Sequence, residues 1–189
     1  MRSEQHLITG AVRALALAAL VPVLAYAQSA LPTLHDQRGH AFSLDSNAGT
    51  PVILTFVAAH CVDTCPIINA QFADMQRQLR HSKLPIHLLT LTLDPEHDTA
   101  RNMRQIATTF GADPRFWIVA SGSKSDIRVL MHRFNVTSSR GNRQYDDIHT
   151  TFVYLLDKHG HIVKTMMAST NLPADLFAEL QRNWNKLNV

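Results

Sequence analysis

Two apolar segments limit the folds open to this chain more than any other feature of its sequence. Residues 51–59 (PVILTFVAA) are nearly all apolar with β-branched members, and residues 86–93 form a second such run, as expected of strands buried on both faces. Between them, apolar side chains recur at helical spacing at Ile68, Phe72, Met75 and Leu79. The sequence therefore predicts a strand, helix, strand unit with a right-handed parallel crossover.

The rest of the chain continues this alternation. A helix is predicted from the capping pair Asp98-Thr99 to Gly111, and another from Ser123 or Lys124 through Phe134. The other predicted elements are a short strand at 116–120, an antiparallel hairpin formed by 151–157 and 162–167, and a last helix at 173–187. This pattern predicts an α/β domain with a mixed sheet flanked by helices, ending in a β-hairpin and a helix. The order is that of thioredoxin-like folds.

The first residues have the features of an export signal. Arg2 and Arg13 give a positive start, residues 14–24 form a short apolar run, and Ala25-Tyr26-Ala27 is an A-x-A cleavage pattern. An uncleaved anchor is the alternative, but this run is well short of the roughly 20 apolar residues that a spanning helix needs. We expect cleavage after Ala27, which leaves a single domain of residues 28–189. The protein should be exported, to the periplasm in a Gram-negative bacterium, and meet a membrane only through a partner.

The charge of the chain excludes several kinds of partner. Removing residues 1–27 takes away two arginines and one glutamate, which lowers the net charge from +3 to an ordinary +2. The sequence has no basic run and no glycine-rich phosphate loop. We therefore expect neither a nucleic acid nor a nucleotide as a partner.

The two cysteines of the chain are its candidate functional residues. Cys61 and Cys65 stand at the carboxyl end of the first predicted buried strand, where ligand sites of open α/β sheets collect. Pro66 suits the first position of the following helix, so Cys65 is predicted near the N-cap, where free amides and the helix dipole favour a thiolate. A thiolate is both a nucleophile and a ligand for soft metals.

A purely structural disulfide is the alternative role for this pair. Closing a loop of about 5 residues stabilises a protein by only about 2 kcal/mol, and this chain can build a core without it. The four-residue step also differs from the C-x-x-C of thioredoxins and leaves a wider loop. Two sulfur ligands favour Cu(I) or zinc, but a structural zinc site needs four protein ligands and no further cysteines exist. A set of two sulfurs and one imidazole suits copper better.

Three segments, CVDTCP at 61–66, TLDPEHDT at 92–99 and YDDIHTTFVYLLDKHG at 145–160, resemble the Sco/SenC family of copper-handling proteins associated with cytochrome oxidase assembly. The resemblance covers most of the chain after residue 27. It implies a thioredoxin-like fold and copper bound by Cys61, Cys65 and His149. Val62 stands where the family often has proline, and Ala58-Ala59 replace larger residues, so the stiffness of the loop differs while all three ligands remain.

The resemblance leaves two functions open. The first is a copper-binding assembly factor that holds one ion per chain, Cu(I) or Cu(II), and delivers it to a cytochrome oxidase copper subunit or reduces that subunit's cysteines. Another thiol or copper protein of the same compartment is an alternative partner. The second function is a thiol-disulfide oxidoreductase that uses the Cys61/Cys65 couple without obligatory copper. A peroxidase is disfavoured because Ala58, where peroxiredoxins have threonine, stands three residues before Cys61.

Other polar and sulfur side chains near these motifs are not predicted to be ligands. His60 is left out of the site, because the side chain next to Cys61 on a strand points to the opposite face. Met166 and Met167 lie in a predicted strand and are expected to pack in the core rather than to bind copper. Asp63 and Asp94 are equally plausible as organisers of the cysteine loop and as turn or cap residues.

Overall fold

A computed structural model describes residues 31–45, 49–82, 84–137 and 151–188. These residues form one seven-stranded sheet in the order β2-β1-β5-β4-β3-β6-β7. The strands are β1 (Leu34–His35), β2 (Ala41–Phe42), β3 (Val52–Val57), β4 (His87–Thr92), β5 (Trp117–Gly122), β6 (Phe152–Leu156) and β7 (Ile162–Met167). The helices are α1 (Thr64–Ser82), α2 (Ala100–Phe110), α3 (Lys124–Arg133) and α4 (Leu172–Leu187).

The strand pairing confirms the predicted mixed sheet. β3 and β4 are parallel neighbours with Ile53 opposite Leu88, and β4 and β5 are parallel as well. Because α1 connects β3 to β4, the predicted strand, helix, strand unit is confirmed. β6 runs antiparallel to β3, and β7 pairs antiparallel with β6 as the predicted hairpin. The carboxyl ends of the parallel strands therefore meet at one edge.

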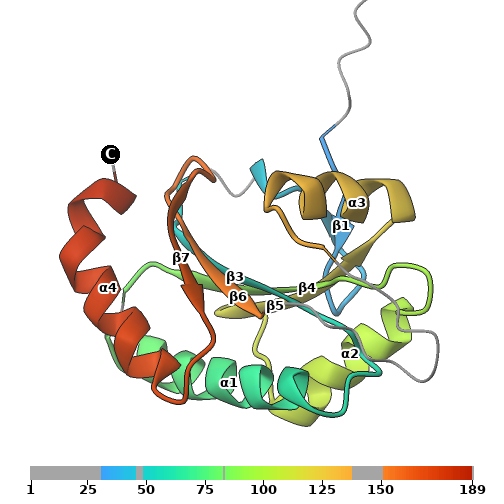
Figure 1. Ribbon diagram of the computed structural model, residues 1–189, viewed down its shortest axis with the longest axis horizontal. Helices are drawn as coiled ribbons and strands as arrows, with labels where there is room; N and C mark the ends of the chain where they lie inside the picture. The colour runs from blue at the N-terminus through green and yellow to red at the C-terminus, as the bar shows by residue number, and fades with distance from the viewer. Residues whose placement is uncertain (1–30, 46–48, 83, 138–150, 189) are drawn as a thin grey trace, which may run out of the picture.

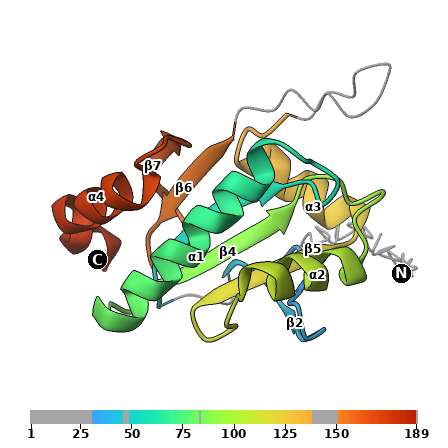
Figure 2. The same cartoon turned by 90° about the horizontal axis from the view of Figure 1, so that it is seen from below.

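Helices cover both faces of the sheet, as Figures 1 and 2 show. α1, α2 and α4 lie on one face and α3 lies on the other. Successive residues of β3 serve the two faces in turn, since Ile53 and Val57 pack with α1 residues such as Phe72 whereas Leu54 and Phe56 pack in the core on the α3 side. A strand that is apolar on both faces therefore belongs between two layers of helices.

Local capping chemistry sets the ends of the central helices. Thr99 caps α2 through a capping box with Asn102, and Gly111 ends it at a positive φ of 66°. Ser123 caps α3 by accepting a hydrogen bond from the Asp126 amide. These ends agree with the predicted ones. α1 begins at Thr64, two residues before the predicted first position at Pro66, so Cys65 lies inside the first turn rather than at its cap.

The two amino-terminal strands were missed by the sequence analysis. Each is only two residues long, too short for an alternating pattern to show. Asp36 forms the turn between them by accepting hydrogen bonds from the Arg38 and His40 amides. Gln37 then fastens this hairpin to β5, donating to the Trp117 carbonyl and accepting from the Val119 amide.

The carboxyl-terminal hairpin corrects one expectation about methionines. Met166 is half-buried and packs against the core, as predicted, but Met167 is 67% exposed. Successive side chains of β7 point to opposite faces, so the two methionines cannot both reach the core. None of the helices in the four described ranges is both long enough and apolar enough to cross a bilayer. The predicted signal segment and His149 lie outside the described residues.

Candidate metal and redox site

The two cysteines lie together where β3 gives way to α1. Cys61 is in the loop after β3, with its amide donating to the Ala58 carbonyl at 3.2 Å. Cys65 is the second residue of α1, and its side chain packs in the core on the α1 face of the sheet. Both side chains are thiols rather than halves of a disulfide, and a side-chain hydrogen bond joins them. The structure thus brings together two of the three predicted site residues.

The environments of the two thiols shift their pKa values in opposite directions. Burial raises the pKa of Cys61, but hydrogen bonds from the Cys65 and Asp63 amides and from the side chains of Cys65 and Thr64 outweigh it, so the net pKa is lowered. Thr64 Oγ1 lies 3.8 Å from Cys61 Sγ. Burial, together with the hydrogen bond to Cys61, raises the pKa of Cys65 to about 12. When the pair loses its first proton, the negative charge therefore forms on Cys61.

This result corrects the expectation that Cys65 carries the stabilised thiolate. The helix start does supply the stabilising amides, but they point at Cys61, which precedes the helix. Cys65 is 2% exposed, and at that depth the cost of removing a thiolate from water exceeds the benefit of the helix dipole. Cys61, which is partly exposed, is the thiol that can meet another molecule first.

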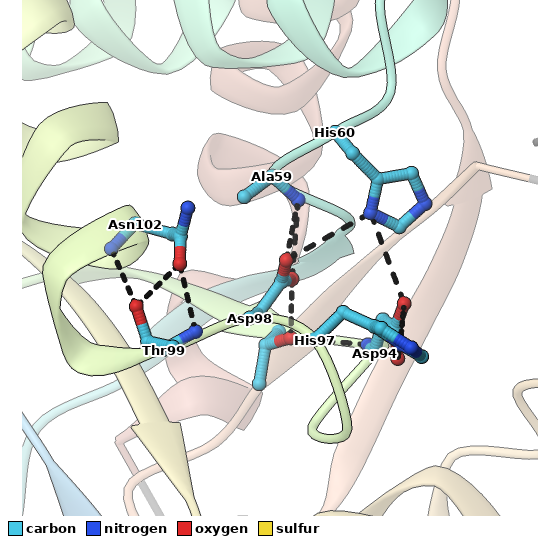
Figure 3. A network of polar contacts seen from close by, with 8 residues as sticks. Ala59, His60, Asp94, His97, Asp98, Thr99 and Asn102 are labelled. Carbon is cyan, nitrogen blue, oxygen red and sulfur yellow. Dashed lines mark hydrogen bonds and ion pairs between the residues drawn. The ribbon is translucent and has the colours of Figure 1, made fainter.

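A buried carboxylate fixes the loop that leads to Cys61, as Figure 3 shows. Both oxygens of Asp98 accept hydrogen bonds from the Ala59 amide, at 3.2 and 3.1 Å, and one accepts from Thr92 Oγ1 at 2.6 Å. Burial raises the pKa of Asp98 and the nearby charge of Asp94 adds to it, whereas the Thr92 and Ala59 bonds act against the rise. Asp98 thereby joins the end of β4 to the loop after β3.

Asp94 and two histidines extend this network. His97 Nδ1 lies 2.9 Å from an Asp94 oxygen, and the Asp94 amide donates to Thr92 Oγ1 at 3.0 Å. His60 Nδ1 lies 3.8 Å from Asp94 and 3.9 Å from Asp98 (Figure 3). Asp94 is buried and lies near His60 of the loop, whereas Asp63 is exposed, so of the two candidate organisers Asp94 is the one that contacts the loop from the end of β4.

Asp98 was not among the site residues predicted from the sequence, and His60 was excluded for a reason that does not hold. β3 ends at Val57, so His60 is in a turn and the alternation of a strand does not apply to it. Asp98 was assigned only to the cap of α2, a role that Thr99 fills. A signal for Asp98 was nevertheless present in the sequence. Asp98 lies in the segment TLDPEHDT, which begins at the carboxyl end of a predicted strand, close to the cysteine loop.

The donor set suits a soft metal ion. In the described ranges, no group of three or more histidine, cysteine or acidic side chains has the arrangement of a metal site. His149, the third predicted ligand, lies outside these ranges. The two adjacent sulfurs alone form a soft pair that fits Cu(I) by type, with Cys61 ionised first and Cys65 able to follow once a cation offsets its buried charge.

The same arrangement suits thiol-disulfide exchange. A partly exposed thiol of lowered pKa is suited to attack a disulfide, and a buried thiol hydrogen-bonded to it is placed to resolve the mixed disulfide. The geometry therefore supports both metal binding and electron transfer by one pair of atoms.

Comparison with known proteins places this site in a family. The family model described as SCO1/SenC matches residues 31–185, which is most of the chain. A curated relative, the SCO1 protein homolog of Bacillus subtilis, is 24% identical over 145 residues, covering 76% of this chain and 75% of that protein.

Solved structures show the same fold. ScoI of Bradyrhizobium japonicum, determined with copper bound, is 25% identical and superposes with a TM-score of 0.67 over 79% of this chain and 95% of that one. BsSco, a Sco-family cytochrome c oxidase assembly protein with a disulfide switch, is 22% identical, with a TM-score of 0.67 over 79% and 89% of the two chains. The thioredoxin-like fold is confirmed, and this chain belongs to the SCO1/SenC family.

Proposed function

We propose that this protein binds one copper ion through Cys61, Cys65 and His149 and uses it to assemble the copper site of a cytochrome oxidase subunit. The observation that carries the proposal is the hydrogen-bonded thiol pair, in which Cys61 is exposed enough to receive the ion and ionises at a lowered pKa. Copper bound to ScoI of Bradyrhizobium japonicum and the assembly role of BsSco support it. Another thiol or copper protein of the compartment remains an alternative partner.

Each residue has a distinct part in this function. Cys61 offers its thiolate at the surface, and Cys65 loses its proton as the cation arrives, because metal binding releases protons from ligands of raised pKa. The Asp98 bonds to Ala59 and Thr92 hold the loop so that Cys61 stays beside Cys65. Copper is the cargo that the pair receives and passes on.

Thiol-disulfide exchange is the second candidate function, and the opposite pKa shifts of the two thiols favour it. The Cys61 thiolate attacks one sulfur of a client disulfide, which forms a mixed disulfide and releases the other client sulfur as a thiolate. Cys65 then gives up its proton and attacks Cys61, which forms the Cys61-Cys65 disulfide and releases the second client sulfur. Two electrons pass from this pair to the client.

The substitution His149→Ala separates the two functions. Loss of one of three ligands should weaken copper affinity by about a hundredfold or more, taking the 10 to 100-fold cost of losing a residue that only orients a ligand as a floor. The Cys61/Cys65 couple needs no imidazole and should still cycle with a small thiol reductant. Copper affinity is measured by competition with a chelator, and redox cycling by thiol titration.

A matched control is His132→Ala, which removes an exposed histidine from α3, on the other face of the sheet. It should leave both copper affinity and cycling unchanged. Full copper affinity in a folded His149→Ala variant excludes His149 as a ligand and moves the oxidoreductase function ahead. Loss of both properties in a folded His149→Ala variant shows that the two functions cannot be separated as proposed.

A further inference from the structure

A groove of about 440 Å³ opens beside the cysteine pair. One wall is the start of α1, from Thr64 through Ile67 to Gln71, and the other is the end of β7 with the turn that follows, from Met167 to Thr170. β7 runs toward the layer of α1 before the chain turns into α4 (Figure 1). The groove therefore lies between two elements that are far apart in the sequence.

Exposed apolar side chains gather at this groove. The described residues include six large hydrophobic side chains that are strongly exposed, and two of these, Ile67 at 59% and Met167 at 67%, line the groove. A third, Val62 at 92%, stands in the loop directly after Cys61. Apolar groups held in water beside a reactive pair are characteristic of a surface that another molecule covers.

The walls of the groove are fixed and carry no charge. Gln71 Nε2 donates to the Ser169 carbonyl at 2.7 Å and so ties α1 to the turn after β7. The lining includes Ile68, which is buried in the core, and three residues that carry hydroxyls, Thr64, Thr151 and Ser169. No charged residue is among the described residues that line it. A groove of this kind suits an uncharged apolar side chain carried on a polar backbone.

One residue of the groove lies beside the reactive sulfur. Thr64 lines the groove, and its hydroxyl lies 3.8 Å from Cys61 Sγ. A protein cysteine that approaches Cys61 brings its neighbouring residues with it, and an extended chain advances about 3.3 Å per residue. The residues that flank such a cysteine can therefore reach the groove.

We infer that this groove binds the client polypeptide, by taking up a large uncharged apolar side chain about one to three residues from the client cysteine that meets Cys61. The inference deepens the proposed function and rests on it. Met167 suits this role, because an unbranched thioether adapts to different apolar partners. The groove would select among clients, whereas the two sulfurs supply the chemistry.

Peptide binding tests the groove without using thiol chemistry. The probes are two ten-residue peptides that differ only in a leucine or a serine placed two residues from a serine, which stands for the client cysteine. Fluorescence anisotropy with the full chain should show about tenfold tighter binding of the leucine peptide. Ile67→Asp and Met167→Asp should remove that preference. Both positions are exposed, so these variants should fold.

Val129→Asp is the matched control, since Val129 is 56% exposed on α3 and lies outside the groove. It should retain the tenfold preference. Equal binding of the two peptides by the unchanged protein overturns the inference, and so does an equal loss in Val129→Asp. If Ile67→Asp and Met167→Asp instead abolish self-association while the peptide preference persists, the groove holds a second copy of this chain and the inference is wrong.

Copper titration of the same variants separates this inference from the proposed function. If every variant binds copper but the protein shows no preference between the peptides, the inference about the groove is wrong and the proposed function stands. A leucine preference that depends on Ile67 and Met167, found in a protein whose cysteines bind no copper, supports the groove and contradicts copper binding.

Discussion

At the scale of single residues, the properties of the site arise from a difference between two identical side chains. Cys61 and Cys65 are four positions apart, yet the amides at the start of α1 point at Cys61 while the core surrounds Cys65. Hydrogen bonds to the charged form lower one pKa, and loss of water raises the other. In the part of the chain that the structure describes, hydrogen-bond donors and burial therefore make the two thiols unequal.

Removing the Cys65 thiol should make Cys61 less reactive. Because Cys65 donates a hydrogen bond to Cys61 Sγ, the variant Cys65→Ala should raise the pKa of Cys61 and slow its alkylation by iodoacetamide at neutral pH. The variant Cys65→Ser keeps a donor and should change the rate less. Alkylation rates measured by mass spectrometry against pH give both values. A faster rate in Cys65→Ala contradicts the assignment.

The buried Cys65 thiol should also make stability depend on pH in the alkaline range. Its pKa is 9.0 in an unfolded chain and about 12 in the folded one, so the folded state holds the proton more strongly. This contribution is fully present below pH 9 and is lost as pH rises from 9 to 12, on the order of a few kcal/mol. The free energy of unfolding of the reduced protein, measured with urea, should therefore fall more over this pH range than that of Cys65→Ser. Parallel losses in the two proteins contradict the burial argument.

At the scale of elements, the loop before Cys61 depends on one carboxylate. Asp98→Ala would leave the buried Thr92 hydroxyl and the Ala59 amide without their acceptor. Each unpaired group costs roughly 1 to 3 kcal/mol, so the free energy of unfolding measured with urea should fall by an amount of that order. Asp63→Ala, in the exposed part of the same loop, should stay within about 0.5 kcal/mol of the unchanged protein. Equal losses of unfolding free energy in the two variants would contradict a structural role for Asp98.

Elements with a long repeating pattern could be predicted from the sequence, and short or edge elements could not. The apolar runs of β3 and β4 and the spacing in α1 and α2 are repeated over many residues, so their types and approximate ends followed. β1 and β2 depend instead on the Asp36 turn and on Gln37 bonds to a strand some 80 positions away. Met167 is exposed because β7 is the edge strand with one face outside the core.

The same limit applies to the site. Cys61 and Cys65 were found because they are the only cysteines in the sequence and stand at a strand's carboxyl end. The relative depths of their sulfurs, and the approach of Asp98 to the Ala59 amide, depend on how β4 and the loop after β3 pack together. Such contacts between distant segments leave no periodic signal.

At the scale of the whole molecule, the fold presents the thiol pair at the carboxyl end of β3, where α1 begins. Helices pack on both faces of the sheet (Figure 1). We propose that the protein reaches its client by export, with residues 1–27 removed. Mass analysis of protein from its native compartment should find a chain that starts at Gln28 or within about two residues of it. Recovery of the full-length chain from the cytoplasm contradicts export.

The central claim is that Cys61 and Cys65 hold copper together. The most direct measurement is alkylation of the reduced protein during titration with Cu(I), with each cysteine followed separately by mass spectrometry. Alkylation of Cys61, and the slower alkylation of the buried Cys65, should stop together and be fully suppressed at about one copper per chain. Copper bound at that ratio while both thiols remain open to alkylation would contradict it.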